Sequence, residues 1–173
     1  MMHFFKKRTI QLNESIMKEL IIEKTPDTPH IELNHLTGDL IFYGKSLPEN
    51  SARIYEPVLQ WVSEYIMEAR PVTNLRLNLE CCNTSSTVWF TKIFKMLLRL
   101  NEPDFTVILH LYLPIEDYEE INDFEDIKDA FLPLSNIDNN YIPCIEIKLY
   151  GLNGKGEICK ETLIFIEDEQ FAG

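Results

Sequence analysis

The sequence is short of positive charge and has no long apolar run. Lysine and arginine total 16 against 28 aspartate and glutamate residues, which gives a net charge of -12. A nucleic-acid-binding surface takes most of its affinity from cations that neutralise phosphates, so we expect protein partners and no nucleic acid. No apolar run approaches the ~20 residues that a membrane-spanning helix needs, so we expect no membrane partner either.

Glycine is also scarce, and the motifs that need it are missing. The chain has 6 glycines, and it contains neither a G-x-S-x-G elbow nor a glycine-rich phosphate loop. An enzyme would need a nucleophile with a base beside it. The candidates are Cys82 and Ser85 as nucleophiles and His30, His35 and His110 as bases. No spacing in the sequence pairs them, so we expect a protein that is not an enzyme and needs no cofactor.

Cysteine offers no metal site or disulfide framework. The chain has four, at Cys81, Cys82, Cys144 and Cys159. Adjacent residues of a strand point to opposite faces, so the first two cannot share a metal ion. The basic N-terminus is not followed by the apolar stretch of a secretory signal. We therefore expect a cytoplasmic protein with reduced thiols.

The length of 173 residues predicts one domain with three parts. Residues 1–16 show no periodicity and are interpreted as a disordered leader, which leaves Met1 or Met17 as the translation start. Residues 17–134 are the main body of the domain. Residues 135–173 are a C-terminal hairpin extension of the same domain.

Alternating apolar residues predict strands along much of the chain. The predicted strands cover residues 20–22, 30–34, 40–43, 75–82, 105–113, 145–149 and 162–166. A turn is expected at Gly38, and Asn153-Gly154 predicts a hairpin turn between the last two strands. With that turn as centre, Cys144 lies opposite Leu163 and not opposite Cys159.

Three segments have the apolar spacing of helices. The first follows a cap at Asn50 or Ser51, and Pro57 should either kink it or end a short first turn. Its Trp61 and Tyr65 are expected in the core. The second helix follows residues 83–87, and the third is expected from about Glu119 to Leu132. The predicted fold class is α/β (α+β), with a mixed sheet and helices packed on one face.

A cluster of hydroxyls marks the start of the second helix. The segment reads Asn83-Thr84-Ser85-Ser86-Thr87. Serine and threonine are good helix caps, so one of them is expected there for structural reasons alone. Four hydroxyls at the positive end of a helix also predict a place where a phosphate is tolerated.

Two short boxes, separated by about one helix and one strand, resemble those of a known family. Leu47-Pro48-Glu49-Asn50-Ser51 is followed by Asn83-Thr84-Ser85-Ser86, with Trp61 and Glu64-Tyr65 between them. This pattern, which runs from about Met17 to about Leu100, is similar to the SiaC family of regulatory phosphoproteins. The resemblance implies a fold like that of STAS-type anti-sigma factor antagonists.

The resemblance also implies a function and a set of partners. Thr84 takes the place of the phosphorylated threonine, with Ser85, Ser86 and Thr87 as alternative acceptors. In the family, a kinase with a histidine-kinase-like ATPase domain adds the phosphate and a PP2C-type phosphatase removes it. The unphosphorylated protein binds and activates an effector such as a diguanylate cyclase. The chain departs from the family pattern after Leu100.

Two other functions stay open at this point. The chain could act on an anti-sigma factor, as STAS proteins do, or it could be a constitutive protein-binding module without a phosphate. The residues expected to contact a partner are Asn83, Thr84, Ser85, Lys92 and Lys95. The last two form a basic stripe with Arg99 on the second helix, for which solvated surface cations are the simpler explanation.

Overall fold

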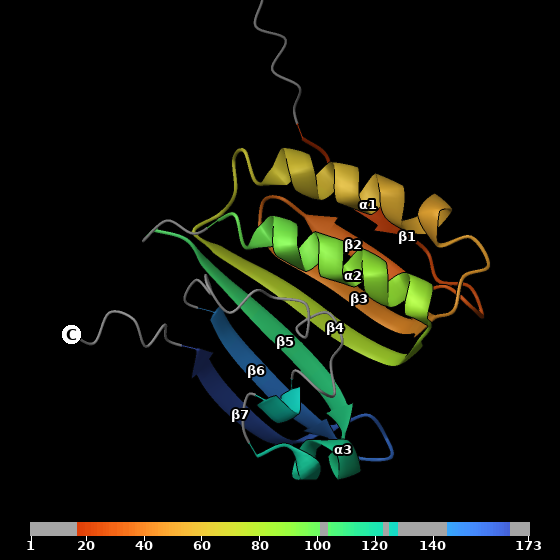
Figure 1. The fold of residues 1–173 in the computed structure, drawn as a ribbon, viewed down its shortest axis with the longest axis vertical. Helices are drawn as coiled ribbons and strands as arrows, with labels where there is room; N and C mark the ends of the chain where they lie inside the picture. Colours follow the sequence, from red (N-terminus) through yellow and green to blue (C-terminus); the bar gives the residue numbers. More distant parts are fainter. Residues whose placement is uncertain (1–16, 101–103, 123–124, 128–144, 167–173) are drawn as a thin grey trace, which may run out of the picture.

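The computed structural model describes residues 17–100, 104–122, 125–127 and 145–166, and its main feature is one seven-stranded sheet (Figure 1). The strands lie side by side in the order in which they occur along the chain. They are β1 (Leu20–Ile22), β2 (His30–Asn34), β3 (Asp39–Ser46), β4 (Val72–Cys82), β5 (Thr106–Pro114), β6 (Ile145–Leu152) and β7 (Ile158–Ile166). The predicted leader and the end of the main body lie outside the described residues.

The first three strands form an antiparallel meander, as their short turns predict. β1 pairs with β2, and β2 pairs with β3 in the register that sets Ile31 opposite Phe42. Gly38 turns the chain between β2 and β3 with φ 78°, a conformation that favours glycine. A side chain at this position would also collide with the carbonyl oxygen of Val72.

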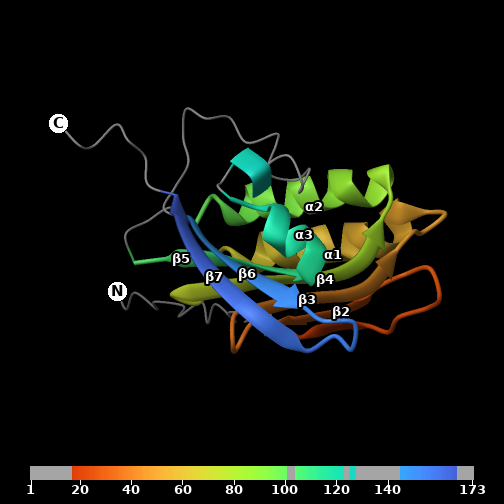
Figure 2. The ribbon, with the colours of Figure 1, turned by 90° about the horizontal axis from the view of Figure 1, so that it is seen from below.

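The next three pairings are parallel, and each is connected through a helix. β3 pairs with β4, β4 with β5 and β5 with β6 in parallel, whereas β6 and β7 form an antiparallel hairpin. The connecting helices are α1 (Ser51–Tyr65), α2 (Thr84–Leu97) and α3 (Ile115–Glu120). All three lie on one face of the sheet (Figures 1 and 2). The predicted fold class is therefore confirmed.

The core lies between that face and the two long helices. The apolar side of β4 contributes Leu75 and Leu77, and α2 contributes Phe90 and Phe94, all nearly inaccessible to solvent. The Trp61 and Tyr65 side chains are also buried, as predicted. No helix in the described part of the chain is long and apolar enough to cross a membrane.

Two details of the predicted elements are wrong. α1 is one continuous helix with Pro57 inside it, so the proline does not end a separate first turn. The third helix ends at Glu120, about where it was expected to begin, because Pro114 starts it early. Residues 125–127 are helical, as predicted, and the Ile127 side chain is fully buried. The predicted third helix beyond residue 127 lies outside the described residues.

The register of the last hairpin also differs from the prediction. Leu163 lies opposite Lys148, and Cys144 lies outside the described residues. The turn extends over five residues, because the Asn153 side chain accepts hydrogen bonds from the backbone N–H groups of Lys155 and Glu157. Gly156, rather than Gly154, takes the positive φ of 78°.

Candidate functional site

The two boxes noted in the sequence lie next to each other at the carboxyl ends of β3 and β4. β3 and β4 are parallel neighbours, so the loops that follow them lie side by side. The backbone N–H of Asn83 donates to the carbonyl of Ser46 at 2.9 Å. Its side-chain amide donates to the Pro48 carbonyl at 3.4 Å, and Trp89 Nε1 donates to Ser51 Oγ at 3.1 Å. The hydroxyl-rich turn is therefore fastened to the loop before α1.

Asn83 is the cap of α2, where a serine or threonine was expected. Its Oδ1 accepts from the Ser86 N–H at 2.9 Å and from Ser85 Oγ at 2.9 Å. In the same way Asn50 caps α1 by accepting from the Arg53 N–H at 3.2 Å. Thr84 is thus the first residue of α2 and carries no capping role.

The four hydroxyls of the turn have four different surroundings. Ser86 is fully buried, and Thr87 is half-buried and donates to the Asn83 carbonyl at 3.1 Å. Ser85 is exposed, and its hydroxyl donates a hydrogen bond to Oδ1 of the capping residue Asn83. Thr84 is exposed, and its hydroxyl makes no hydrogen bond to any residue that the structure describes. Of the four hydroxyls, that of Thr84 is consequently the one that is both exposed and free of hydrogen bonds to the described residues.

A buried cluster of three hydroxyls holds the turn against the protein interior. Ser46 Oγ donates to Ser86 Oγ at 2.8 Å, and Ser86 Oγ donates to the Ser46 carbonyl at 3.1 Å. Since the Ser46 proton is used in this way, the Tyr55 hydroxyl donates to Ser46 Oγ. Burial raises the pKa of Tyr55, which keeps this hydroxyl protonated. The cluster joins the start of α2 to β3 and α1.

The residues expected to contact a partner lie along α2. Asn83, Thr84 and Ser85 are consecutive, and Lys92 lies eight residues after Thr84, about 12 Å along the helix axis. The Lys92 Nζ is 4.4 Å from the centre of the Trp89 ring, a cation–π contact that fixes it on the surface. Lys95 is exposed in the last turn. One surface strip of α2 therefore carries Thr84, Val88, Lys92 and Lys95.

The pairs that an enzyme would need are not brought together. In the described residues no hydrogen bond joins His30, His35 or His110 to Cys82 or Ser85. Burial raises the pKa of the Cys82 thiol, which lowers its reactivity as a nucleophile. No group of three metal-ligating side chains occurs in the part of the chain that the structure describes.

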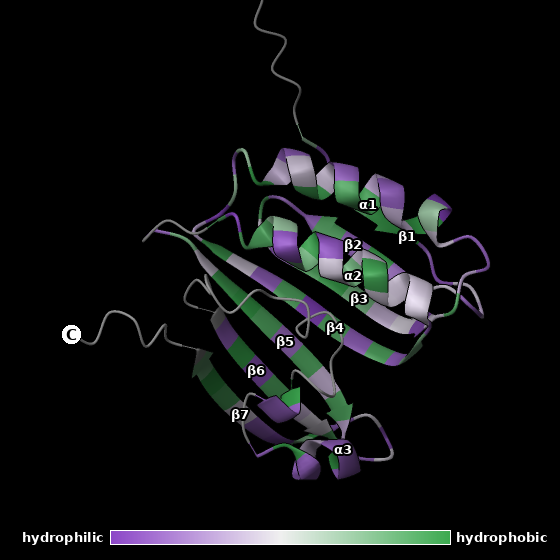
Figure 3. Cartoon of the chain, viewed as in Figure 1, coloured by the Kyte–Doolittle hydropathy of each residue, from purple (hydrophilic) through white to green (hydrophobic). Residues whose placement is uncertain are grey.

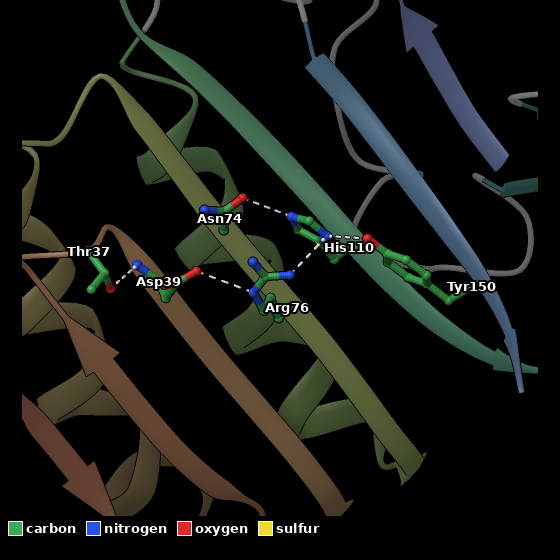
Figure 4. Close-up of polar contacts among 6 residues, drawn as sticks. All are labelled: Thr37, Asp39, Asn74, Arg76, His110 and Tyr150. Carbon is green, nitrogen blue, oxygen red and sulfur yellow. Dashed lines mark hydrogen bonds and ion pairs between the residues drawn. The ribbon is translucent and has the colours of Figure 1, made fainter. Parts of the chain in front are cut away.

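A second polar cluster lies on the face of the sheet that the helices leave open (Figure 4). Arg76 on β4 is 3.2 Å from Asp39 on β3 through Nε and 3.2 Å from His110 Nδ1 through Nη1. His110 Nδ1 is also 2.9 Å from the Tyr150 hydroxyl on β6, and its Nε2 is 2.9 Å from Asn74 Oδ1. The residues are separated by at least 34 positions in the three contacts of His110, so no sequence motif signals this cluster.

The cluster holds His110 in its neutral form. Arg76 can only donate, so Nδ1 accepts and the Nε2–H group donates to Asn74. Burial, with help from the charges of Arg76 and Lys148, lowers the pKa of His110 to about 4. The imidazole is 3% exposed and is a structural member of the sheet, not a base positioned for catalysis.

Comparison with known proteins identifies the shared part of the chain. Residues 22–138 match a model of the SiaC family, described as regulatory phosphoproteins. An uncharacterised protein of Pseudomonas aeruginosa strain UCBPP-PA14 is 36% identical over 70 residues. This alignment covers 40% of the present chain and 56% of the length of that relative, so the chain spans little more than half of it.

Solved structures give the same result. The crystal structure of apo-SiaC from P. aeruginosa superimposes with a TM-score of 0.55 at 29% identity, covering 60% of this chain and 86% of that one. The crystal structure of diguanylate cyclase SiaD in complex with its activator SiaC matches with a TM-score of 0.56 at 26% identity, covering 65% and 88%. The family match ends before β6, so the last hairpin lies outside it.

Proposed function

Because this chain belongs to the SiaC family of regulatory phosphoproteins, we propose that it is a partner-switching regulator controlled by phosphorylation of Thr84. The unphosphorylated form binds and regulates a signalling protein, and the phosphate prevents that binding. The main support from the molecule itself is the free, exposed hydroxyl of Thr84 beside three hydroxyls that are buried or already hydrogen-bonded.

The physical basis of the switch is a change of charge on a firmly held surface. A phosphothreonine adds nearly two negative charges. At the first position of α2 this charge meets the positive end of the helix dipole, so the fold tolerates it. A partner docked over the same turn would have to desolvate that charge or oppose it with its own acidic groups. Phosphorylation should therefore weaken binding of the partner and change the free energy of unfolding only slightly.

The effector we propose is a diguanylate cyclase or a protein that occupies the same place in a signalling pathway. The support is the P. aeruginosa structure in which SiaC is the activator bound to the diguanylate cyclase SiaD. We extend the proposal to a kinase with a histidine-kinase-like ATPase domain and a PP2C-type phosphatase, which the family resemblance implies. The contact strip on this chain consists of Asn83, Thr84, Ser85, Lys92 and Lys95.

The proposal is tested by following phosphate and binding together. Wild type, Thr84→Ala and Thr84→Glu are treated with the kinase encoded nearest to this gene, and intact masses are measured. Wild type should gain one phosphate and Thr84→Ala none. The alanine variant should bind the effector in the presence of kinase and ATP, whereas Thr84→Glu should bind weakly. Ser85→Ala serves as the matched control for phosphorylation, because it removes an exposed neighbouring hydroxyl and should still gain one phosphate.

Three results would redirect the proposal. Phosphate on the Thr84→Ala protein would move the acceptor to Ser85, Ser86 or Thr87. Equal binding by wild type, Thr84→Ala and Thr84→Glu, with no phosphate on any of them, would make the chain a constitutive binding module. An anti-sigma factor recovered in place of a cyclase would keep the switch and change the effector.

A further inference from the structure

The exposed side of α2 carries a line of residues that begins at the hydroxyl-rich turn. They recur every three or four positions, so they lie above one another on a single face of the helix. In order they are Thr84, Val88, Lys92 and Lys95, followed by Arg99 in the turn after the helix. All of them are exposed, and Val88 is 49% exposed. Figure 3 shows α2 on the outside of the sheet, with hydrophobic and hydrophilic residues alternating along it.

Acidic residues are missing from this part of a strongly acidic chain. The sequence has 28 aspartate and glutamate residues, yet none lies between Glu80 and Glu102. The helix dipole favours an acidic residue in the first turn of α2, and that turn has none. The dipole accounts for Lys95 in the last turn, but it does not account for Lys92 in the middle of the helix. The stability of α2 therefore does not explain its pattern of charge.

The cations of the basic stripe, Lys92, Lys95 and Arg99, are open to an outside group. None of the ion pairs among the described residues involves these side chains. Lys92 Nζ lies 4.4 Å from the centre of the Trp89 ring, and Trp89 is itself held by its hydrogen bond to Ser51. The ring positions the lysine without neutralising its charge. Carboxylates of another protein could therefore pair with the stripe at no cost in ion pairs of the described residues.

The surface at the start of α2 is apolar rather than basic. Val88 lies in the second turn of the helix, and Leu47, which is 38% exposed, lies beside the first. Leu47 is held there because the carbonyls on either side of it, those of Ser46 and Pro48, accept hydrogen bonds from Asn83. The same face of the molecule therefore offers two apolar side chains at one end and cations at the other.

We propose that this surface binds an acidic amphipathic helix of the partner, with apolar side chains over Leu47 and Val88 and carboxylates over the basic stripe. The inference rests on the proposed function and names the partner chemistry of its contact strip. Exposed residues spaced by three and four positions are those through which two helices pack side by side. Charge sets the direction of the partner helix, because Asp27 and Glu49 are exposed on the loops beside the start of α2 and would repel carboxylates there.

Nucleic acid is a poorer occupant of the same surface. Its affinity would come from cations that neutralise phosphates, and the remainder of this chain, with a net charge of -12 overall, would repel it. It would also leave Leu47 and Val88 without an apolar contact. An acidic helix satisfies both ends of the surface.

NMR titration of the isotope-labelled full-length chain tests the proposal. The probe is a synthetic helical peptide with glutamates along one side and leucines along the other. It should progressively shift the backbone signals of Val88, Lys92 and Lys95. The same peptide with lysine in place of glutamate should leave them unchanged, and so should a single-stranded DNA of equal charge. No shift of these signals with the acidic peptide, or an equal shift with the DNA, would overturn the proposal.

A charge reversal carries the test to the effector used for the Thr84 experiment. The double variant Lys92→Glu with Lys95→Glu should bind the peptide and the effector at least about tenfold more weakly, because it sets like charges against each other. Lys155→Glu is the matched control, since it reverses an exposed lysine in the turn of the last hairpin and should bind as wild type does. Thermal unfolding checks that each variant is folded.

The outcomes separate this inference from the phosphate switch. A folded double variant that binds the effector as wild type does, while Thr84 still controls binding, would overturn the inference and leave the switch in place. Binding that needs the basic stripe in a chain that is never phosphorylated would support the inference and end the switch. Equal losses in the double variant and in Lys155→Glu would show a general effect of charge and would also overturn the inference.

Discussion

At the residue scale, neighbouring polar residues of the hydroxyl-rich turn have different structural roles. Asn83 holds the end of α2, Ser86 anchors the turn to the core, and Thr84 has no structural bond to lose. Composition alone predicts a cap and a phosphate site in this segment. It cannot assign them, because the assignment depends on Ser46 and Pro48, which lie more than thirty residues earlier in the chain.

A pair of alanine substitutions separates the two roles. Asn83→Ala removes the cap of α2 and the bond to the Pro48 carbonyl, so the free energy of unfolding should fall by about 1 kcal/mol or somewhat more. Thr84→Ala should change it by less than about 0.5 kcal/mol. Urea unfolding of both variants measures the difference. A loss at Thr84 equal to that at Asn83 would show that the threonine has a capping role after all.

The buried imidazole of His110 predicts a dependence of stability on pH. Its pKa is about 4 in the folded protein and near 6.5 in the unfolded chain, so between these values the unfolded chain binds the extra proton. Stability should therefore be complete above about pH 6.5 and should fall as the pH is lowered towards 4. The loss is on the order of 3 kcal/mol when it is complete.

The measurement compares wild type with His110→Gln by urea unfolding from pH 7.5 to 4.5. The advantage of wild type over the variant should shrink as the pH falls, because glutamine does not titrate. Carboxylates elsewhere in the two proteins titrate alike and cancel in the difference. A wild-type advantage that is constant over this range would mean that His110 keeps its ordinary pKa.

At the scale of elements, most of the sheet could be predicted from alternation. Leu75, Leu77 and Leu79 mark one face of β4, and the glycine at position 38 marks the turn before β3. α3 was missed because Ile115–Glu120 is short and has no apolar stripe. The hairpin register was missed because the Asn153 side chain, and not an Asn-Gly pair, organises the turn.

The polar cluster on the open face could not be predicted. Its members come from β3, β4, β5 and β6, and the sequence does not reveal which strands are neighbours. Hydrophobic periodicity reports which side of a strand is buried. It does not report that His110 will lie between Asn74 and Tyr150. Predicting this cluster requires knowing which strands are neighbours in the folded sheet.

The C-terminal hairpin contributes to the stability of the sheet and does not cover its open face. β6 pairs with β5 along eight positions and places Tyr150 beside His110. Truncation after Leu134 should uncover the β5 edge and leave part of the core exposed, so the shortened chain should aggregate. Size-exclusion chromatography with light scattering and a thermal melt would detect this. A soluble monomer with a cooperative transition would mark the hairpin as an appendage.

At the scale of the whole molecule, the turn that carries Thr84 and the last hairpin lie apart. Thr84 begins the helix that follows β4, whereas β7 is three strands away in the sheet, at least about 14 Å across the ladder. Figure 1 shows the start of α2 and β7 at different margins of the sheet. The binding switch that we propose at Thr84 should therefore not depend on direct contact with the hairpin.

The order of the strands bears on how the protein forms during synthesis. Because the spatial order of all seven strands follows the chain order, no strand has to enter between two that have already paired. On a ribosome, each strand leaves the exit tunnel when its neighbour is already available. The nascent sheet can thus grow from β1 outward, with β5 as its open margin until the hairpin is released. The hairpin of β6 and β7 then closes that margin and leaves β7 as the outermost strand of the described sheet.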